Sequence, residues 1–136
     1  QVLNLMKDIQ KELNLTYLFI AHDLSVVQYM SDRIVVMYLG KIMELGDADE
    51  LFEHPLHPYS KILLDAAPKM SSDYKNREDV IRGDLPSPIN LPSGCRFHPR
   101  GPCVGGRCGR VQPELEERRP GHLCACHHPL GGGDTQ

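Results

Sequence analysis

The chain has 136 residues, a formal charge of −3 at pH 7 and an isoelectric point near 6.2. This charge balance gives no electrostatic reason to expect nucleic-acid binding, and no apolar run approaches the roughly 20 residues that span a bilayer. All five cysteines follow Gly94, and an odd number in one segment favours a metal or cluster site over a closed disulfide framework.

The first segment predicts an amphipathic helix followed by a buried strand. Apolar residues recur at helical spacing from Val2 to Leu13, which gives the helix one apolar face, and Asn14 suits the position just past its end. The run from Tyr17 to Ala21 is short, apolar and rich in β-forming residues. Such a run is typical of a strand buried on both faces of a parallel sheet, and helix, strand and helix in this order belong to an α/β unit.

His22 stands where this strand gives way to the next helix, whose apolar residues begin at Leu24. In open α/β sheets, ligands bind at the carboxyl ends of the strands. A histidine at that edge offers one hydrogen-bond donor or acceptor to a phosphate or a water molecule. The alternative is that His22 only caps the helix or binds a loop carbonyl, and the spacing alone leaves both interpretations open.

Two β-rich runs predict a hairpin after the second helix. The runs are Arg33 to Tyr38 and Ile42 to Leu45, with a turn at Gly40 between them and Gly46 at the end. We expect this hairpin to complete one edge of the sheet, with Glu44 solvated rather than functional.

Two short helices follow, separated by prolines. Asp47 suits the N-cap of a helix from about Ala48 to Glu53, and Glu50 is placed to complete a capping box. Pro58 suits the first turn of a second helix, which Pro68 ends.

His54 and His57 invite a metal-site interpretation because histidine is a common metal ligand. The intervening prolines keep the two side chains off a common helical face, so a structural role is favoured.

Three segments resemble the ATP-binding subunits of ABC transporters. Ile20 to Val27 is similar to the switch-histidine segment of these ATPases. His54 to Ser60 resembles the His-Pro-Tyr segment of the oligopeptide/dipeptide (peptide/nickel) subgroup, and Leu85 to Arg100 resembles that subgroup's C-terminal extension. The three segments follow the order of the family, and the resemblance extends to about Cys126.

The sequence contains no Walker A loop, signature motif or Walker B carboxylate. The resemblance therefore implies the C-terminal part of a P-loop ABC ATPase of α/β class, and we expect this segment to be inactive alone. In the family, the switch histidine contacts the γ-phosphate of ATP and is needed for hydrolysis. This assigns His22 as the catalytic residue, as the one ATP contact within this segment, and ATP with Mg²⁺ as the cofactors.

We expect four parts along the chain. Residues 1–68 are assigned to the nucleotide-binding domain and residues 69–94 to a polar, then proline-rich, linker. Residues 95–128 form the cysteine-containing extension, expected to be small and irregular, and residues 129–136 a disordered tail.

The extension of this subgroup often carries four cysteines that can hold an iron–sulfur cluster. Gly101 stands where the family's second cysteine is expected, so Cys103 is predicted to supply the fourth ligand of a 4Fe–4S cluster, with Cys124 as the alternative. Soft thiolates suit such a cluster or zinc, whereas reduced, unligated thiols are the other open interpretation. The cysteines that match the family directly are Cys95, Cys108 and Cys126.

The resemblance implies the ATP-hydrolysing subunit of an importer of dipeptides or oligopeptides. Its expected partners are transmembrane permease subunits, a second ATP-binding subunit (identical or related) and, indirectly, a peptide-binding protein, with no nucleic acid. The expected location is peripheral, on the cytoplasmic face of the inner membrane. Related members carry nickel or other solutes, so the solute stays open. A stand-alone metal or iron–sulfur binding interaction module is the alternative from another class.

Overall fold

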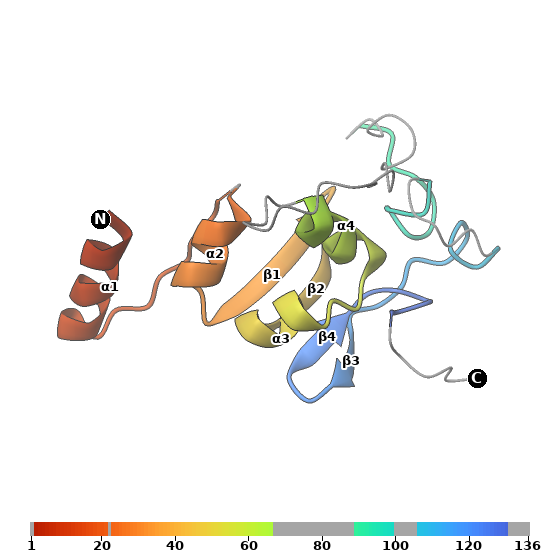
Figure 1. Ribbon diagram of the computed structural model, residues 1–136. Coiled ribbons are helices and arrows are strands. Elements are labelled where there is room, and N and C mark those ends of the chain that lie inside the picture. The colour runs from red at the N-terminus through yellow and green to blue at the C-terminus, as the bar shows by residue number, and fades with distance from the viewer. Residues whose placement is uncertain (1, 22, 67–88, 100–105, 131–136) are drawn as a thin grey trace.

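The computed structural model describes residues 2–21, 23–66, 89–99 and 106–130. Within these ranges, four helices accompany one four-stranded antiparallel sheet (Figure 1). This mixture of helices and sheet agrees with the expected α/β class at a coarse level. In the described ranges, no helix combines the length and the apolar character that crossing a membrane requires.

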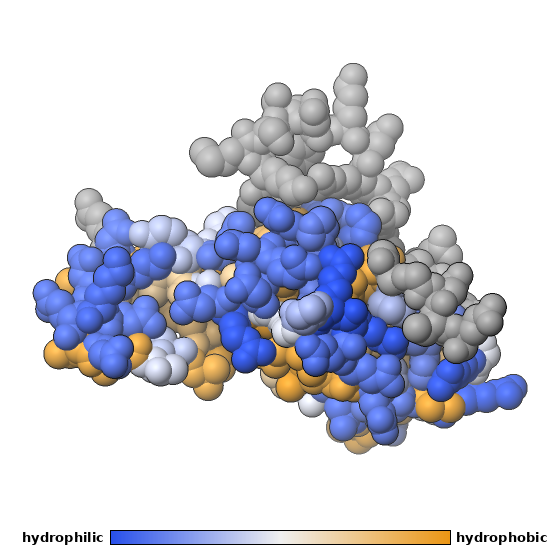
Figure 2. All heavy atoms as spheres, turned by 90° about the horizontal axis from the view of Figure 1, so that it is seen from below, coloured by the Kyte–Doolittle hydropathy of each residue, from blue (hydrophilic) through white to orange (hydrophobic). Residues whose placement is uncertain are grey.

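Helix α1 (Val2–Leu13) ends as the sequence predicts. Asn14 has a φ of 52°, and the backbone N–H of Leu15 donates to the carbonyl of Gln10 at 3.0 Å, which is the bond of a Schellman-type helix end. No residue of α1 is buried, and the helix lies at one end of the molecule, apart from the sheet (Figure 1). Figure 2 shows apolar surface at this end and again over the middle of the molecule.

The prediction of a strand from Tyr17 to Ala21 is wrong, because the structure has no strand there. Residues 15–21 are irregular and belong to no sheet. Leu18 is 92% exposed and Ile20 is 89% exposed. The physical reason is that a parallel-type strand needs neighbours to pair its backbone N–H and C=O groups, and no described strand lies beside this segment.

The hairpin after helix α2 (Leu24–Met30) is confirmed, and it is longer than expected. Strand β1 (Arg33–Tyr38) pairs with strand β2 (Lys41–Asp47), which continues through Gly46 instead of ending there. Positive φ angles at Leu39 and Gly40, 47° and 77°, form the two-residue turn and match the twist of an antiparallel pair.

The extension contributes a second hairpin, which corrects the expectation that it is irregular. Strand β3 (Glu116–Arg119) and strand β4 (His122–Cys124) pair with each other, and β4 also pairs with β2. The sheet order is therefore β1-β2-β4-β3. Without β4, the outer edge of β2 would present unpaired backbone groups, and this is why the later segment is drawn into the sheet. We call β3, β4 and the turn between them the C-terminal hairpin.

Helices α3 (Ala48–Glu53) and α4 (Pro58–Ala66) begin where the sequence predicts. The Asp47 carboxylate caps α3 by accepting from the backbone N–H groups of Asp49, at 3.1 Å, and Glu50, at 3.5 Å. The Glu50 side chain does not complete the expected capping box. Its carboxylate instead pairs with Arg119 of the C-terminal hairpin at 2.9 Å. Pro68, the expected end of α4, lies outside the described residues.

Two apolar clusters form most of the core, and the extension supplies part of one of them. The first cluster contains Ile34, Ala48 and Leu51, with Val27 packed against it. The second joins the β1–β2 hairpin to the extension, and its buried members are Tyr38, Met43, Cys95 and Phe97. The extension is therefore packed into the fold.

Gly94 is the tightest turn of the extension, and it yields a stability prediction. Gly94 has a φ of 70°, and a Cβ there would lie 2.4 Å from the carbonyl oxygen of Cys108. Gly40 has a φ of 77° but open space around it. Both changes to alanine incur the positive-φ strain of about 1 to 2 kcal/mol, and only Gly94→Ala must also displace backbone, at about 1 to 3 kcal/mol more.

Chemical denaturation of both variants measures this difference. We expect Gly94→Ala to lower the free energy of unfolding clearly more than the Gly40→Ala control. Equal decreases in the free energy of unfolding for the two variants would show that the backbone around Gly94 shifts at little energetic cost.

Candidate functional site

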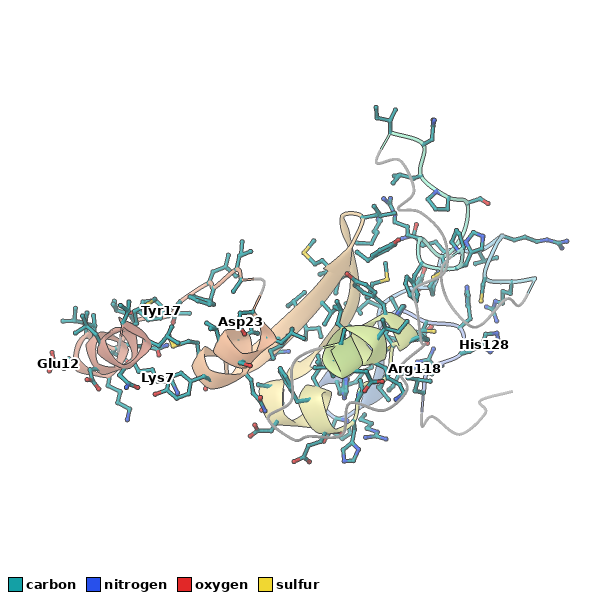
Figure 3. The ribbon with its side chains drawn as sticks, turned by 45° about the horizontal axis from the view of Figure 1, so that its top comes forward. Lys7, Glu12, Tyr17, Asp23, Arg118 and His128 are labelled. Carbon is teal, nitrogen blue, oxygen red and sulfur yellow. The ribbon has the colours of Figure 1, made fainter. Side chains whose placement is uncertain are left out.

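Helix α2 begins two residues after His22, the predicted switch histidine, which lies outside the described residues. The cap of α2 is Asp23 (labelled in Figure 3). Its carboxylate accepts from the backbone N–H groups of Ser25, at 2.9 Å, and Val26, at 3.4 Å. Asp23 is therefore the N-cap of α2, and the helix needs no cap from His22.

The position of α2 is set by contacts with α3. Val27 packs against the cluster of Ile34, Ala48 and Leu51, and the last two of these belong to α3. The backbone N–H of Ala48 also donates to the carbonyl of Asp32 at 2.9 Å, which ties the start of α3 to the turn after α2.

Helix α1 is attached to this region by surface contacts. Lys7 Nζ lies 3.9 Å from the ring centre of Tyr29, a cation–π contact, and the Tyr29 hydroxyl bonds with the side chain of Asn4. The Tyr17 hydroxyl donates to the carbonyl of Met6 at 3.1 Å. Lys7 and Tyr17 are labelled on and beside α1 in Figure 3. These contacts are exposed or partly buried, so α1 is less firmly held than the sheet.

Glu44 on β2 is the most deeply buried charge of the described chain, which corrects the expectation that it is solvated. Its side chain has no exposed surface. One oxygen accepts from the backbone N–H of Leu56 at 2.8 Å, and the other from that of His57 at 3.0 Å. Nε2 of His122, on the C-terminal hairpin, lies 2.5 Å from Glu44 Oε1, and because a carboxylate only accepts, that nitrogen carries the proton. We call this arrangement the Glu44 junction.

Of the two histidines of the His-Pro segment, His57 has the structural role favoured from the sequence, and the backbone of His54 ends a helix. Nδ1 of His57 accepts from the backbone N–H of Tyr59 at 3.0 Å, so His57 caps α4. The backbone N–H of His54 donates to the carbonyl of Glu50 at 2.8 Å and ends α3. Burial lowers the pKa of His57 to about 4, and the negative charge of Glu44 opposes that shift only partly. His57 is therefore neutral at pH 7.

The C-terminal hairpin makes a second polar contact with the body of the fold. Arg119 Nη1 donates to Glu50 Oε1 at 2.9 Å, and both side chains are about one-third exposed. This bond holds the pKa of Glu50 below its usual range. Nδ1 of His122 lies 3.8 Å from the same Glu50 oxygen, so His122 stands between two carboxylates that belong to β2 and α3.

Four of the predicted cluster cysteines are described, and all four are buried free thiols: Cys95, Cys108, Cys124 and Cys126. The backbone N–H of Cys95 donates to the carbonyl of Cys108 at 2.8 Å, whereas Cys124 and Cys126 pack with Leu56. Burial raises the pKa of the Cys95 thiol and, strongly, that of Cys124, where the charge of Glu44 adds to the effect. At Cys124 the positive charge of Arg118 opposes this shift but does not outweigh burial, so the protonated form, a poor metal ligand, is favoured for both thiols.

Within the described residues, no group of three or more His, Cys, Asp or Glu side chains is arranged to hold a metal ion. These side chains therefore do not by themselves fit a 4Fe–4S cluster. Cys103 lies outside the described residues, so the full predicted set of Cys95, Cys103, Cys108 and Cys126 stays a prediction.

Sequence reasoning missed the Glu44 junction and the pairing of Glu50 with Arg119. A weak signal was present, because Pro120-Gly121 between two short runs is a turn pattern. The partner of each side chain could not be found locally, since His122 lies 78 positions from Glu44 and Arg119 lies 69 positions from Glu50.

Comparison with known proteins places these features in a family. Residues 43–108, which contain most of β2, all of α3 and α4 and the first cysteines, match the family described as "Oligopeptide/dipeptide transporter, C-terminal region". This similarity covers just under half of the chain. The resemblance to ATP-binding proteins of the oligopeptide/dipeptide subgroup is thereby confirmed.

Curated relatives of this family extend the match over most of the chain. The oligopeptide transport ATP-binding protein AppF of Bacillus subtilis is 51% identical over 93% of this chain and 39% of its own length. The dipeptide transport ATP-binding protein DppF of Haemophilus influenzae is 48% identical over 94% of this chain and 39% of its own. A Brucella ovis protein, provisionally named a peptide import ATP-binding protein, is 48% identical over 93% of this chain and 40% of its own. The chain thus spans about two-fifths of the length of these relatives.

The depressed pKa of His57 predicts a pH dependence of stability. The unfolded chain takes up a proton on this residue near pH 6.5, whereas the folded chain does so only near pH 4. The contribution of neutral His57 to the free energy of unfolding is therefore complete above about pH 6.5. This contribution is lost as the pH falls toward 4, and the loss reaches about 3 kcal/mol.

The variant His57→Asn keeps an acceptor for the N–H of Tyr59 but does not titrate. Urea unfolding at several pH values should show wild type and variant converging in stability between pH 6.5 and 4. A constant difference across this range would mean that His57 titrates normally in the fold.

Proposed function

We propose that the chain is the C-terminal part of the ATP-hydrolysing subunit of an importer of dipeptides or oligopeptides, and that His22 is its switch histidine. The names of the relatives support this, since each is an ATP-binding protein of peptide transport or import. Because the chain spans about two-fifths of those relatives, the Walker A, signature and Walker B motifs are assigned to the rest of the longer protein.

The observation that carries the proposal is the unpaired apolar segment before His22. Leu18 and Ile20 are about nine-tenths exposed, although a run of this type is suited to burial on both faces. Val35 and Met37 on β1 are about half exposed as well. Further strands and helices from the rest of the subunit would cover these side chains and pair the segment into a parallel sheet.

In that completed sheet, His22 would follow the carboxyl end of a strand, where α/β proteins bind their ligands. An imidazole there would donate one hydrogen bond toward the γ-phosphate of ATP, with its backbone held by the completed strand before it and by α2 after it. Asp23 caps the helix, which leaves the histidine free for this role. Mg²⁺ bound with ATP would neutralise the remaining negative charge of the phosphates.

The implied partners are transmembrane permease subunits, a second ATP-binding subunit and, indirectly, a peptide-binding protein. These partners place the subunit peripherally on the cytoplasmic face of the membrane. We assign peptides as the solute class because the relatives named for a solute carry peptides. A stand-alone metal-binding module is not favoured, because the described chain packs its extension into the same sheet as the transporter segment.

His22→Ala in the intact subunit tests the proposal. A side chain that acts on charge developing at the γ-phosphate matters more for rate than for binding, and its loss should lower turnover by about 10²- to 10³-fold. ATP affinity should stay nearly unchanged. His54→Ala is the matched control, because His54 is exposed and ends α3 through its backbone. Turnover of His22→Ala within a few-fold of the wild type would remove the switch assignment.

The iron–sulfur cluster is carried forward as a separate prediction with its own measurement. If Cys103 completes a ligand set with Cys95, Cys108 and Cys126, protein purified without oxygen contains iron and acid-labile sulfide, and Cys103→Ser abolishes both. Cys124→Ser serves as the control, because this thiol lies fully buried on β4 beside Leu56, and it should leave both in place. Protein free of both iron and zinc, with reduced thiols, would instead favour the unligated interpretation.

A further inference from the structure

We infer that the C-terminal hairpin positions the helix that follows the switch histidine, and that it does so through the ion pair between Arg119 and Glu50. The inference rests on the proposed function, and it adds a role for the extension in ATP turnover. Arg119 and Glu50 are positioning residues, and neither needs to touch the nucleotide.

The contacts form an unbroken series from the hairpin to α2. Arg119 on β3 donates to Glu50 on α3 at 2.9 Å. The neighbouring residue, Leu51, belongs to the cluster against which Val27 of α2 packs. Helix α3 has six residues, so its polar contact with the hairpin and its apolar contact with α2 lie within one short, stiff element.

The hairpin is itself held firmly, which lets it act as a support. His122 on β4 bonds with the fully buried Glu44 at 2.5 Å, and β4 pairs with β2 along the sheet. The turn after α2 is tied to the start of α3 by the bond from Ala48 to Asp32. A shift of α3 away from the hairpin would therefore move α2, through Val27 and through the turn after it, and the N-cap of α2, Asp23, directly follows His22.

Stability and positioning can be separated at this ion pair. Both side chains are about one-third exposed, and exposed ion pairs contribute little to folding. The Arg119→Ala and Glu50→Gln variants should therefore fold. If the pair serves only as a surface contact, neither variant changes turnover.

The experiment measures ATP affinity, turnover and melting temperature in the intact subunit. We expect Arg119→Ala and Glu50→Gln each to lower turnover by about three- to tenfold, the size of a coupling carried through packed elements, with ATP affinity unchanged within about twofold. Arg119→Lys should recover most of the turnover because it restores the charge. Lys61→Ala is the matched control, since it removes the exposed Lys61–Asp65 pair on α4 and should leave turnover unchanged.

The outcomes separate this inference from the proposed function. If His22→Ala collapses turnover but Arg119→Ala and Glu50→Gln do not lower it, the positioning role is wrong and the switch assignment stands. If Arg119→Ala lowers affinity, turnover and melting temperature together, the pair is merely structural and the inference fails. Retained turnover in His22→Ala would instead refute the proposed function.

Discussion

The carboxylate of Glu44 is the constraint on which the described fold depends. Removing such a charge from water costs several kcal/mol unless hydrogen bonds and an opposite dipole or charge replace the water. The replacements come from three separate segments: β2 carries the charge, the loop between α3 and α4 supplies two backbone N–H groups, and the C-terminal hairpin supplies His122. None of the three can take its place without the other two, so the extension is a component of the fold rather than an appendage.

Local signals predicted the elements whose cause is local. Asn14 ends the first helix, Asp47 caps α3 and Pro58 starts α4, since each effect acts within a few residues. The strand expected at Tyr17–Ala21 failed because strands depend on partners that the described chain does not contain. The burial of Glu44 escaped prediction for the same reason, as its partner histidine is remote in the sequence.

The candidate site was predicted mainly by resemblance and only partly by residue chemistry. Family comparison confirms the subgroup, and the structure adds that Asp23, rather than the histidine before it, caps α2. The cysteines show the limit of spacing arguments. Their density suggested a ligand set, but the described thiols are buried, and burial raises the pKa of Cys95 and Cys124, which favours their protonated form.

The sheet order has a consequence for how the protein is made. Strand β2 receives its outer neighbour, β4, from residues 122–124, which leave the ribosome long after β2 itself. During synthesis the outer edge of β2 therefore has no partner until β4 is made, and Glu44 has only the backbone N–H groups of Leu56 and His57 until His122 is made. An unpaired edge is a site of mispairing between chains, so a nascent subunit that stalls before the last strand is the form of this protein most exposed to aggregation and to recognition by chaperones.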